Sequence, residues 1–442
     1  MKGSECIVIT IRRENIGIVL YSYNKKSYYL IQNVDDVDCI MKYLRTGDKK
    51  IIKDKLSAEL EELDFFSEEK RVVNNLNTHE YPIGAPLEYY FDFTNKCNLR
   101  CTHCYNREYL GSTTMNYDKI KSIIKDMYDC GIMRIHLAGG EPTIDKIGLK
   151  IYMETANKYK IVSSLSSNGV DIDDEIFDII LDNDVFSLTI SLEGANDQSN
   201  GKIRGYGNFD RSVDTIRRFI LKRNLKNKST LVCMKMSYNN LTSIEEFDKF
   251  VELGKKIGVD IIKFANPERC LLHERGFYGK QISEYYKILL NINAVKEKYK
   301  NDIYISVVSN PFNNCNNIGI PEMRGCIGGQ ELLAINPDGR ISPCLMDPIN
   351  LGNIYNYNSI KDMYFNEKIN EYRNLSSNYS CSDDDCQYHS KCRGGCQVRK
   401  IVEYGAMIEK DPLCIFNFDD RKKEKAKIKS KKVSKINILH SL

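Results

Sequence analysis

Cysteine is the residue type in this sequence whose spacing points most directly to chemistry. There are 16 cysteines in 442 residues, and they are clustered rather than evenly spread. Three lie on one short stretch, and seven fall between residues 326 and 414. In a reducing compartment, clustered cysteines are metal ligands or catalytic thiols more often than disulfide partners. The sequence therefore predicts two metal-binding segments, and most of the scattered cysteines are interpreted as small buried hydrophobic residues.

The first segment has the spacing Cys97-x3-Cys101-x2-Cys104 and directly follows a predicted strand. Three thiolates on one loop can bind a four-iron cluster and leave its fourth iron without a protein ligand. A small molecule could chelate that iron. The alternative is a tetrahedral zinc site, for which His103 could supply the fourth ligand.

The second segment has too many cysteines for a single metal ion. Seven thiolates and an eighth ligand would bind two four-iron clusters, whereas a zinc ribbon would need only four. The seven are Cys326, Cys344, Cys381, Cys386, Cys392, Cys396 and Cys414.

The elements that must position these cysteines can be read from hydrophobic patterning. Residues 85–310 alternate strands and helices, which predicts an α/β fold built as a partial (β/α)6 barrel with its active site at the C-terminal strand ends. The predicted strands are Leu87–Phe93, Arg134–Ala138, Ile161–Ser166, Phe186–Leu192, Thr230–Met236 and Ile261–Phe264. The predicted helices are Tyr117–Tyr128, Leu149–Tyr159, Asp174–Leu181, Phe209–Leu221 and Ile244–Ile257.

The flanking regions differ from this repeat. Residues 1–75 show three strands followed by short helices, which predicts a winged-helix-like α+β domain, and residues 69–82 are expected to form a linker. Residues 311–418 show little periodicity, so we expect a loop-rich, cysteine-rich iron–sulfur domain held by metals rather than by a large core. Residues 419–442 form a basic tail, which we expect to be solvated.

Composition excludes several functional classes. The formal net charge is +4, which gives no global basic field for nucleic acid. No apolar run is long enough for a transmembrane helix, and the N-terminus does not resemble a signal peptide. We therefore expect a cytoplasmic protein with neither nucleic acid nor membrane as a partner.

The first cysteine segment, with Tyr105 beside its last cysteine, resembles the signature of radical S-adenosylmethionine (SAM) enzymes. The resemblance covers about residues 85–310 and implies a [4Fe–4S] cluster at Cys97, Cys101 and Cys104 whose open iron binds SAM. Reductive cleavage of SAM then yields a 5′-deoxyadenosyl radical that abstracts hydrogen, while the protein supplies orientation and water exclusion. The positions that match SAM-contacting residues, including the Gly139-Gly140-Glu141-Pro142 motif, are His103, Tyr105, Gly139, Gly140, Glu141, Asn168, Ser191 and Arg204.

The second cysteine segment resembles the SPASM extension of radical SAM peptide and sulfatase maturases, which implies two auxiliary [4Fe–4S] clusters. The first would take Cys326, Cys344 and Cys396, with Cys315 as the nearest candidate for its fourth ligand. The second would take Cys381, Cys386, Cys392 and Cys414. Cys381 and Cys386 are separated by four residues where the family has two. In sulfatase-maturing members of the family, an Asp that acts as a catalytic base follows the second cysteine, whereas this sequence has Leu345 there. Asp347 is not assigned that role. The difference argues against sulfatase maturation.

The front domain resembles the PqqD-like element with which peptide maturases bind a leader peptide as an added strand. The resemblance implies a ribosomal precursor peptide as substrate and an external electron donor of the flavodoxin or ferredoxin type. We expect hydrogen abstraction followed by crosslinking, with a cysteine thioether as first choice, carbon–carbon crosslinking as the main rival, and epimerisation or sulfatase-type maturation as further alternatives. Two other classes, an iron–sulfur electron carrier and a zinc-stapled binding protein, would explain the cysteines without catalysis.

Overall fold

The computed structural model describes residues 8–79, 81–238, 242–265, 282–308, 326–346 and 349–378, followed by residues 392, 394–404, 407, 411–412 and 414. The predicted ligands Cys315, Cys381 and Cys386 and the basic tail 419–442 lie outside the described residues. Within those ranges, every helix is too short or too polar to cross a lipid bilayer.

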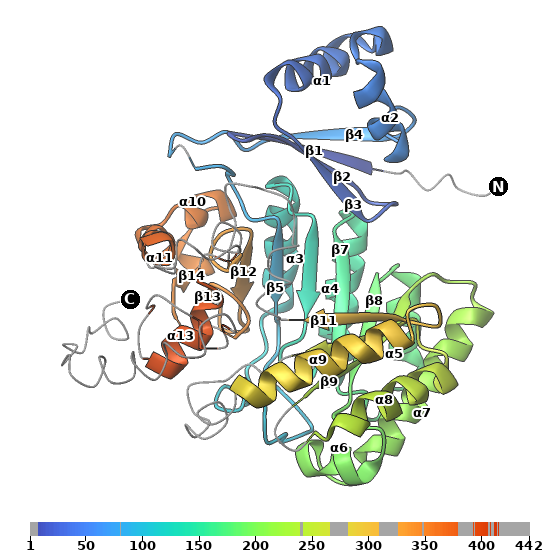
Figure 1. Ribbon diagram of the computed structural model, residues 1–442. Coiled ribbons are helices and arrows are strands. Elements are labelled where there is room, and N and C mark those ends of the chain that lie inside the picture. The colour runs from blue at the N-terminus through green and yellow to red at the C-terminus, as the bar shows by residue number, and fades with distance from the viewer. Residues whose placement is uncertain are drawn as a thin grey trace.

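The N-terminal unit is a four-stranded sheet with helices on one face, which confirms the predicted α+β architecture (Figure 1). Its strand order is β3-β2-β1-β4, with β1 antiparallel to β2 and parallel to β4. The elements are β1 (Val8–Glu14), β2 (Gly17–Ser22), β3 (Ser27–Ile31), α1 (Val34–Thr46), η1 (Lys49–Ile51), α2 (Asp54–Glu62) and β4 (Glu69–Asn74). The predicted linker at 69–82 was wrong in its first half, because residues 69–74 form the edge strand β4.

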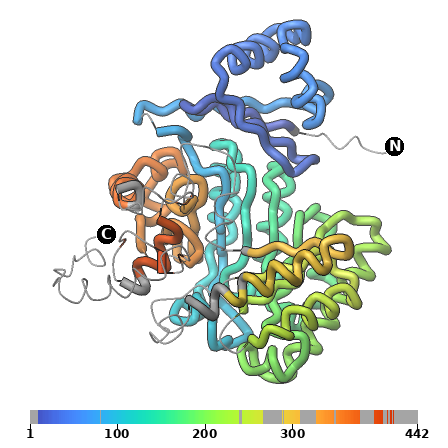
Figure 2. The backbone as a smooth tube through the Cα atoms, viewed as in Figure 1, coloured from blue at the N-terminus to red at the C-terminus, as the bar shows by residue number. Residues whose placement is uncertain are grey.

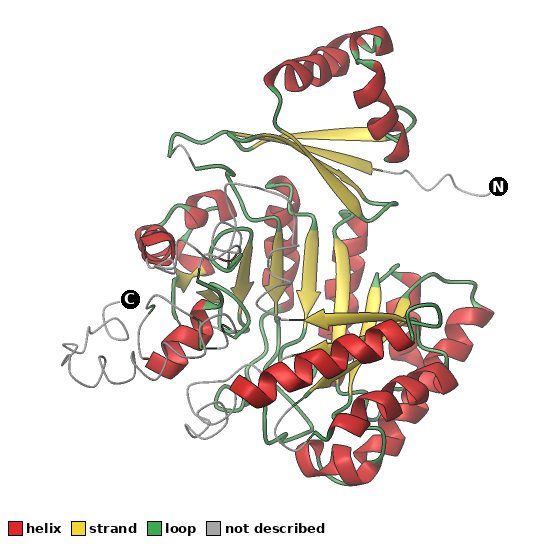
Figure 3. Cartoon of the chain, viewed as in Figure 1, coloured by secondary structure: helices red, strands yellow, loops and turns green. Residues whose placement is uncertain are grey.

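The central unit is a curved run of parallel strands that follow one another in chain order. Six of them are the predicted strands, and β11 extends the sheet by one more. The strands are β5 (Glu88–Phe91), β6 (Arg134–Leu137), β7 (Val162–Ser167), β8 (Ser187–Ser191), β9 (Leu231–Ser237), β10 (Ile261–Ala265) and β11 (Tyr304–Val308). The helices between them are α3 (Tyr117–Asp129), η2 (Pro142–Ile144), α4 (Lys146–Lys158), α5 (Asp174–Asp182), α6 (Asp197–Arg204), α7 (Asn208–Leu225), α8 (Ile244–Ile257) and α9 (Ile282–Lys298). Figure 3 shows these helices along the outside of the strands, as the partial barrel predicts.

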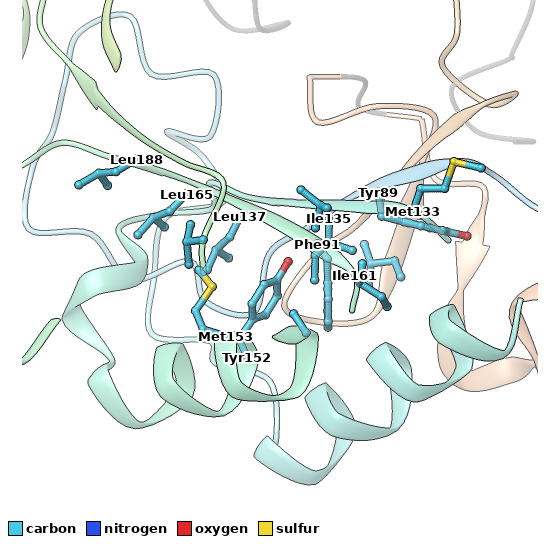
Figure 4. Packing of buried hydrophobic residues seen from close by; sticks show 14 of the residues in the cluster. Tyr89, Phe91, Met133, Ile135, Leu137, Tyr152, Met153, Ile161, Leu165 and Leu188 are labelled. Carbon is cyan, nitrogen blue, oxygen red and sulfur yellow. The ribbon is translucent and has the colours of Figure 1, made fainter. Parts of the chain in front are cut away.

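Alternation along the strands divides the sheet into an apolar outer face and a polar inner face, because successive side chains point to opposite sides. Phe91 and Leu137 pack against Tyr152 and Met153 of α4, and Tyr89 and Ile135 belong to the same hydrophobic core (Figure 4). The side chains of the residues between these apolar positions on the strands point to the inside of the barrel. They include Glu88, Tyr90, His136, Ser164, Thr189, Ser191, Lys235 and Lys263, which the strand register places on one face. An inner face this polar is suited to holding a ligand rather than to filling a core.

The C-terminal unit is joined to the barrel through a strand. β12 (Leu332–Ile335) pairs in parallel with β5, so the sheet continues through β13 (Arg340–Ser342) and β14 (Gly352–Asn353). The remaining elements are η5 (Ile354–Asn356), α10 (Ile360–Tyr364), α11 (Glu367–Asn378) and α13 (Gln397–Tyr404). Figure 2 shows this orange-to-red part of the chain beside β5. The expectation of little core was wrong for the described part, because Leu333, Ile341, Met363 and Tyr372 belong to the barrel's own hydrophobic core.

The N-terminal sheet packs against the N-terminal ends of the barrel strands through a buried ion pair. Arg12 Nε donates to Glu14 Oε1 at 2.7 Å, and both side chains are fully buried. The other Arg12 nitrogens donate to the carbonyl oxygens of Ala85 at 2.5 Å and Pro86 at 2.6 Å, just before β5. Since the helices cover the other face of this sheet with a separate apolar core, the sheet lies between its own helices and the barrel.

Candidate iron–sulfur and S-adenosylmethionine site

The three cysteines of the first segment lie together beyond the C-terminal end of β5. Cys97, Cys101 and Cys104 pack around Leu99 and Val170 in one small cluster. Burial raises the pKa of the Cys97 thiol, and it raises the pKa of Cys104 to about 11. One buried and two partly buried cysteines on one loop, with a cation beside them as described below, fit the donor set of an iron–sulfur cluster, whose irons would stabilise the thiolates.

Among the described residues, no three His, Cys, Asp or Glu side chains are gathered closely enough to hold a single metal ion. His103, the candidate fourth zinc ligand, directs Nε2 to the carboxylate of Glu193 at 3.1 Å.

The Gly139-Gly140-Glu141 turn after β6 forms a support for the cysteine loop. Gly140 N donates to Thr94 O at 3.1 Å, and Glu141 N donates to Lys96 O at 2.6 Å. A Cβ on Gly140 would lie 2.2 Å from Lys96 O. Glycine is therefore required here because two backbone segments approach closely, and the segment approached is the one that leads into the first cysteine.

Glu141 is a buried carboxylate that joins the ends of β6 and β7. Its Oε1 accepts hydrogen bonds from Thr143 N, Thr143 Oγ1 and Ser167 Oγ, and its Oε2 accepts one from Asn168 N at 2.7 Å. Asn168 in turn donates from Nδ2 to Asn98 Oδ1, inside the cysteine loop, at 2.7 Å. The structure thus places both predicted SAM contacts in a network that fixes the loop.

Tyr105 and Ser191 are two further predicted SAM contacts. Burial raises the pKa of Tyr105, next to Cys104, well above its ordinary value, and Asp92 and Cys104 add to the shift. Ser191 ends β8 on the polar inner face, where its register partner is Lys235. Asp92, which the sequence analysis missed, accepts from Ala138 N at 2.9 Å and holds the start of the glycine turn.

Glu193 is a second heavily hydrogen-bonded carboxylate of the site, and no sequence motif indicated it. Arg204 donates to Glu193 Oε1 from Nε at 3.1 Å and from Nη2 at 2.6 Å, and Ser237 N donates to Glu193 Oε2 at 2.7 Å. With His103 this makes four donors from three segments of chain. Burial would raise the pKa of Glu193, but the charges of Arg204 and His103 hold it below its ordinary value.

Arg204 reaches the cysteine loop as well. Its Nη1 lies 3.8 Å from Cys101 Sγ. The predicted SAM-carboxylate partner is therefore held by a neighbouring carboxylate and directed at a cysteine sulfur.

Comparison with known proteins matches residues 91–251 to the radical SAM superfamily and residues 326–397 to the SPASM iron–sulfur cluster-binding domain. The chain is a radical SAM enzyme with a SPASM domain. The radical SAM domain binds S-adenosylmethionine and a [4Fe–4S] cluster, and the SPASM domain binds auxiliary iron–sulfur clusters.

Relatives of similar length support this assignment. The mycofactocin maturase MftC of Mycolicibacterium smegmatis is 23% identical over 80% of this chain and 88% of its own length. The PqqA peptide cyclase of Rhodopseudomonas palustris is 22% identical over 75% of this chain and 87% of its own length. Among solved structures, Streptococcus suis SuiB bound to S-adenosylmethionine has a TM-score of 0.69 at 16% identity and covers 93% of this chain and 99% of its own, which shows a shared fold.

In the SPASM domain, the structure describes five of the seven predicted cysteine ligands: Cys326, Cys344, Cys392, Cys396 and Cys414. The first two belong to adjacent segments, because Gly328 lies against both Cys326 and the backbone of Pro343. Leu345 follows Cys344, and Asp347 lies outside the described residues. The assignment of individual cysteines to two auxiliary clusters stays a prediction.

A buried ion pair connects the last two described cysteine segments of the SPASM domain. Asp411 accepts from Arg399 Nη2 at 2.6 Å and from Cys396 N at 2.8 Å, and its carbonyl oxygen accepts from Cys414 N at 2.9 Å. A Cβ on Gly395 would collide with the Asp411 carboxylate. The carboxylate therefore ties two predicted ligands together, a role that no spacing in the sequence indicated.

Proposed function

We propose that this radical SAM enzyme modifies a ribosomally made precursor peptide. The observation that carries the proposal is that the cysteine site lies at one end of the barrel and a domain whose sheet has the edge strand β3 lies at the other end. Relatives named as a maturase and a peptide cyclase support it, as does SuiB, which has been solved with its precursor peptide SuiA.

Three groups of residues would have different roles in this reaction. Cys97, Cys101 and Cys104 would hold the cluster, and SAM bound to it supplies a 5′-deoxyadenosyl radical that abstracts hydrogen from the substrate. The network of Glu141 and Asn168 fixes the cysteine loop, and the polar inner face of the barrel offers donors and acceptors to a peptide.

The leader peptide would bind the free edge of β3. This strand pairs with β2 on one side and is the last strand of its sheet in the described residues. An extended peptide can add to such an edge through main-chain hydrogen bonds. Tyr28 and Leu30 pack toward the barrel core and Tyr29 toward the helix core, so the edge is held firmly in place.

A hydrogen–deuterium exchange experiment on the full-length protein tests this edge. The probe is a synthetic peptide whose sequence is taken from a short, cysteine-rich reading frame, where one is found beside the gene. Added peptide should protect amides of residues 27–31, whereas β4, the opposite edge of the same sheet, should be unaffected and serves as the matched control. Unchanged exchange at β3 with bound peptide would refute the leader-binding role.

The chemistry has its own test. Anaerobic, reduced protein should release 5′-deoxyadenosine from SAM, and about 12 irons per chain are expected from three four-iron clusters. Cys97→Ala should stop SAM cleavage and leave about eight irons in the auxiliary clusters. About two zinc ions without sulfide would contradict an enzyme of this class.

We further propose that the product is a thioether between a peptide cysteine and a carbon atom. In this step a C–H hydrogen atom goes to the 5′-deoxyadenosyl radical, the cysteine thiol loses its proton, and an auxiliary iron–sulfur cluster would accept the remaining electron as the S–C bond forms. The product is therefore lighter than the precursor by two hydrogens and has lost one thiol that iodoacetamide can alkylate. A carbon–carbon crosslink has the same mass change but keeps the thiol, and epimerisation leaves the mass unchanged. The reducing electron would come from a flavodoxin- or ferredoxin-type protein, so replacing dithionite with either protein should sustain turnover.

A further inference from the structure

Arg204 is restrained in a way that fixes its distance from the cysteine loop. Two of its three guanidinium nitrogens are bonded to Glu193, and its side chain is only 12% exposed. A planar guanidinium held at two corners cannot rotate freely, so the third nitrogen, Nη1, stays directed at Cys101 Sγ.

Glu193 is in turn held independently of Arg204. Its second carboxylate oxygen accepts from Ser237 N at the end of β9, and its own backbone N–H donates to Asn200 Oδ1 at 2.9 Å. The carboxylate is therefore anchored to the barrel and can determine where Arg204 lies.

We propose that Arg204 raises the reduction potential of the SAM-binding cluster through Cys101, and that Glu193 is the positioning residue that holds it there. A cation beside a ligand sulfur stabilises the more negative, reduced cluster, and hydrogen bonds to ligand sulfurs are known to tune such potentials. The inference rests on the radical SAM assignment and is independent of the peptide substrate.

The rival role for Arg204 is to pair with the SAM carboxylate, as the sequence resemblance implies. The two roles predict different reduction potentials for the Arg204 variant when SAM is absent. A residue that acts on the cluster changes its potential in the absence of SAM, whereas a residue that binds only the SAM carboxylate changes the SAM affinity and leaves the SAM-free potential unchanged.

The test is an anaerobic redox titration of full-length, cluster-loaded protein without SAM, followed by electron paramagnetic resonance. The signal of the SAM-binding cluster is identified by its loss in Cys97→Ala. Arg204→Gln should make the reduction equilibrium about tenfold less favourable, which is about 59 mV for a one-electron couple. In the Glu193→Gln background the same change should have an effect of less than about threefold, because Arg204 is no longer held.

Arg223→Gln is the matched control. Arg223 is equally buried, at 12% exposure, and pairs with Asp260, but it lies at the N-terminal ends of β9 and β10, away from the cysteines. Its substitution should leave the potential unchanged. An unshifted potential in Arg204→Gln, or an equal shift in both backgrounds, would overturn the proposal.

SAM affinity is measured on the oxidised proteins, where no turnover occurs. We expect the dissociation constant of Arg204→Gln to change less than about threefold. Weakening beyond about tenfold with an unmoved potential would assign Arg204 to the SAM carboxylate instead. If Arg204→Gln does not retain its cluster, the same redox titration is made on Arg204→Lys. It keeps the charge without the fork, so its shift should be smaller and in the same direction.

Discussion

Glu141 and Glu193 occupy equivalent places in the fold, each just beyond the C-terminal end of a parallel strand. Each is buried, and each collects hydrogen bonds from segments that are distant in sequence. The spacing of Cys97, Cys101 and Cys104 predicted the cysteine loop because all three lie on one short stretch. The spacing could not predict the role of Glu193, because its donors come from three different segments.

Glu331 is another buried carboxyl, and it predicts an unusual pH dependence of stability. It precedes β12, is 1% exposed, and its Oε2 has no hydrogen-bond partner among the described residues. Burial, with a smaller contribution from Glu88, raises its pKa to about 8. An unfolded glutamate ionises near about 4.3, so between these values the folded chain holds one more proton and stability falls as pH rises.

Glu331→Gln removes this titration. Relative to the glutamine variant, the free energy of unfolding of the wild type should decrease as the pH rises from about 5 to about 8. Urea denaturation under anaerobic conditions at several pH values measures it, with the exposed Glu61→Gln as control. A difference from the glutamine variant that stays constant over this range would contradict the prediction.

At the scale of elements, the regular βα repeat was predictable because its strands carry apolar residues at alternate positions and its helices are amphipathic. Among the described strands that escaped prediction, β4 and β12 show the physical reasons. β4 is an edge strand with one buried residue, Val73, so its sequence is polar enough to suggest a linker. β12 is fully buried but short, and it lies in a segment whose glycines and cysteines suppress any periodic signal.

Gly140→Ala tests the contact between two such elements. The new Cβ would meet the backbone of Lys96 and Asn95, so the turn after β6 and the start of the cysteine loop must separate. We expect loss of about four irons and of SAM cleavage, with the auxiliary clusters retained. Iron analysis measures this. Gly111→Ala is the control, because a Cβ there meets only ordinary contacts at 3.7 Å or more. A full iron content in Gly140→Ala would show that the loop tolerates the separation.

At the scale of the whole molecule, Arg12 and Glu14 join the N-terminal sheet to the barrel. Neither residue could be assigned this role from the sequence, because alternating charged residues on a strand usually indicate a solvated face. The partners that make burial tolerable, the carbonyl oxygens of Ala85 and Pro86, lie more than seventy residues away.

Arg12→Ala should therefore be strongly destabilising. It leaves the Glu14 carboxylate buried without its cation, which typically costs about 3–5 kcal/mol. Arg218→Ala, which removes an exposed pair with Asp214, should cost less than about 1 kcal/mol. Denaturant titration compares the two variants, and similar losses for both would show that the interface does not depend on the buried pair.

The N-terminal sheet meets the barrel at the beginnings of its strands, whereas the cysteine loop lies beyond their ends (Figure 1). The six residues of β7 span about 20 Å at about 3.3 Å per residue. Under the proposed function, a peptide anchored on β3 would cross that length, so about six or more extended residues would separate the anchored segment from the modified one. The enzyme would then act as a molecular ruler, choosing its target by distance along the substrate as well as by side-chain identity.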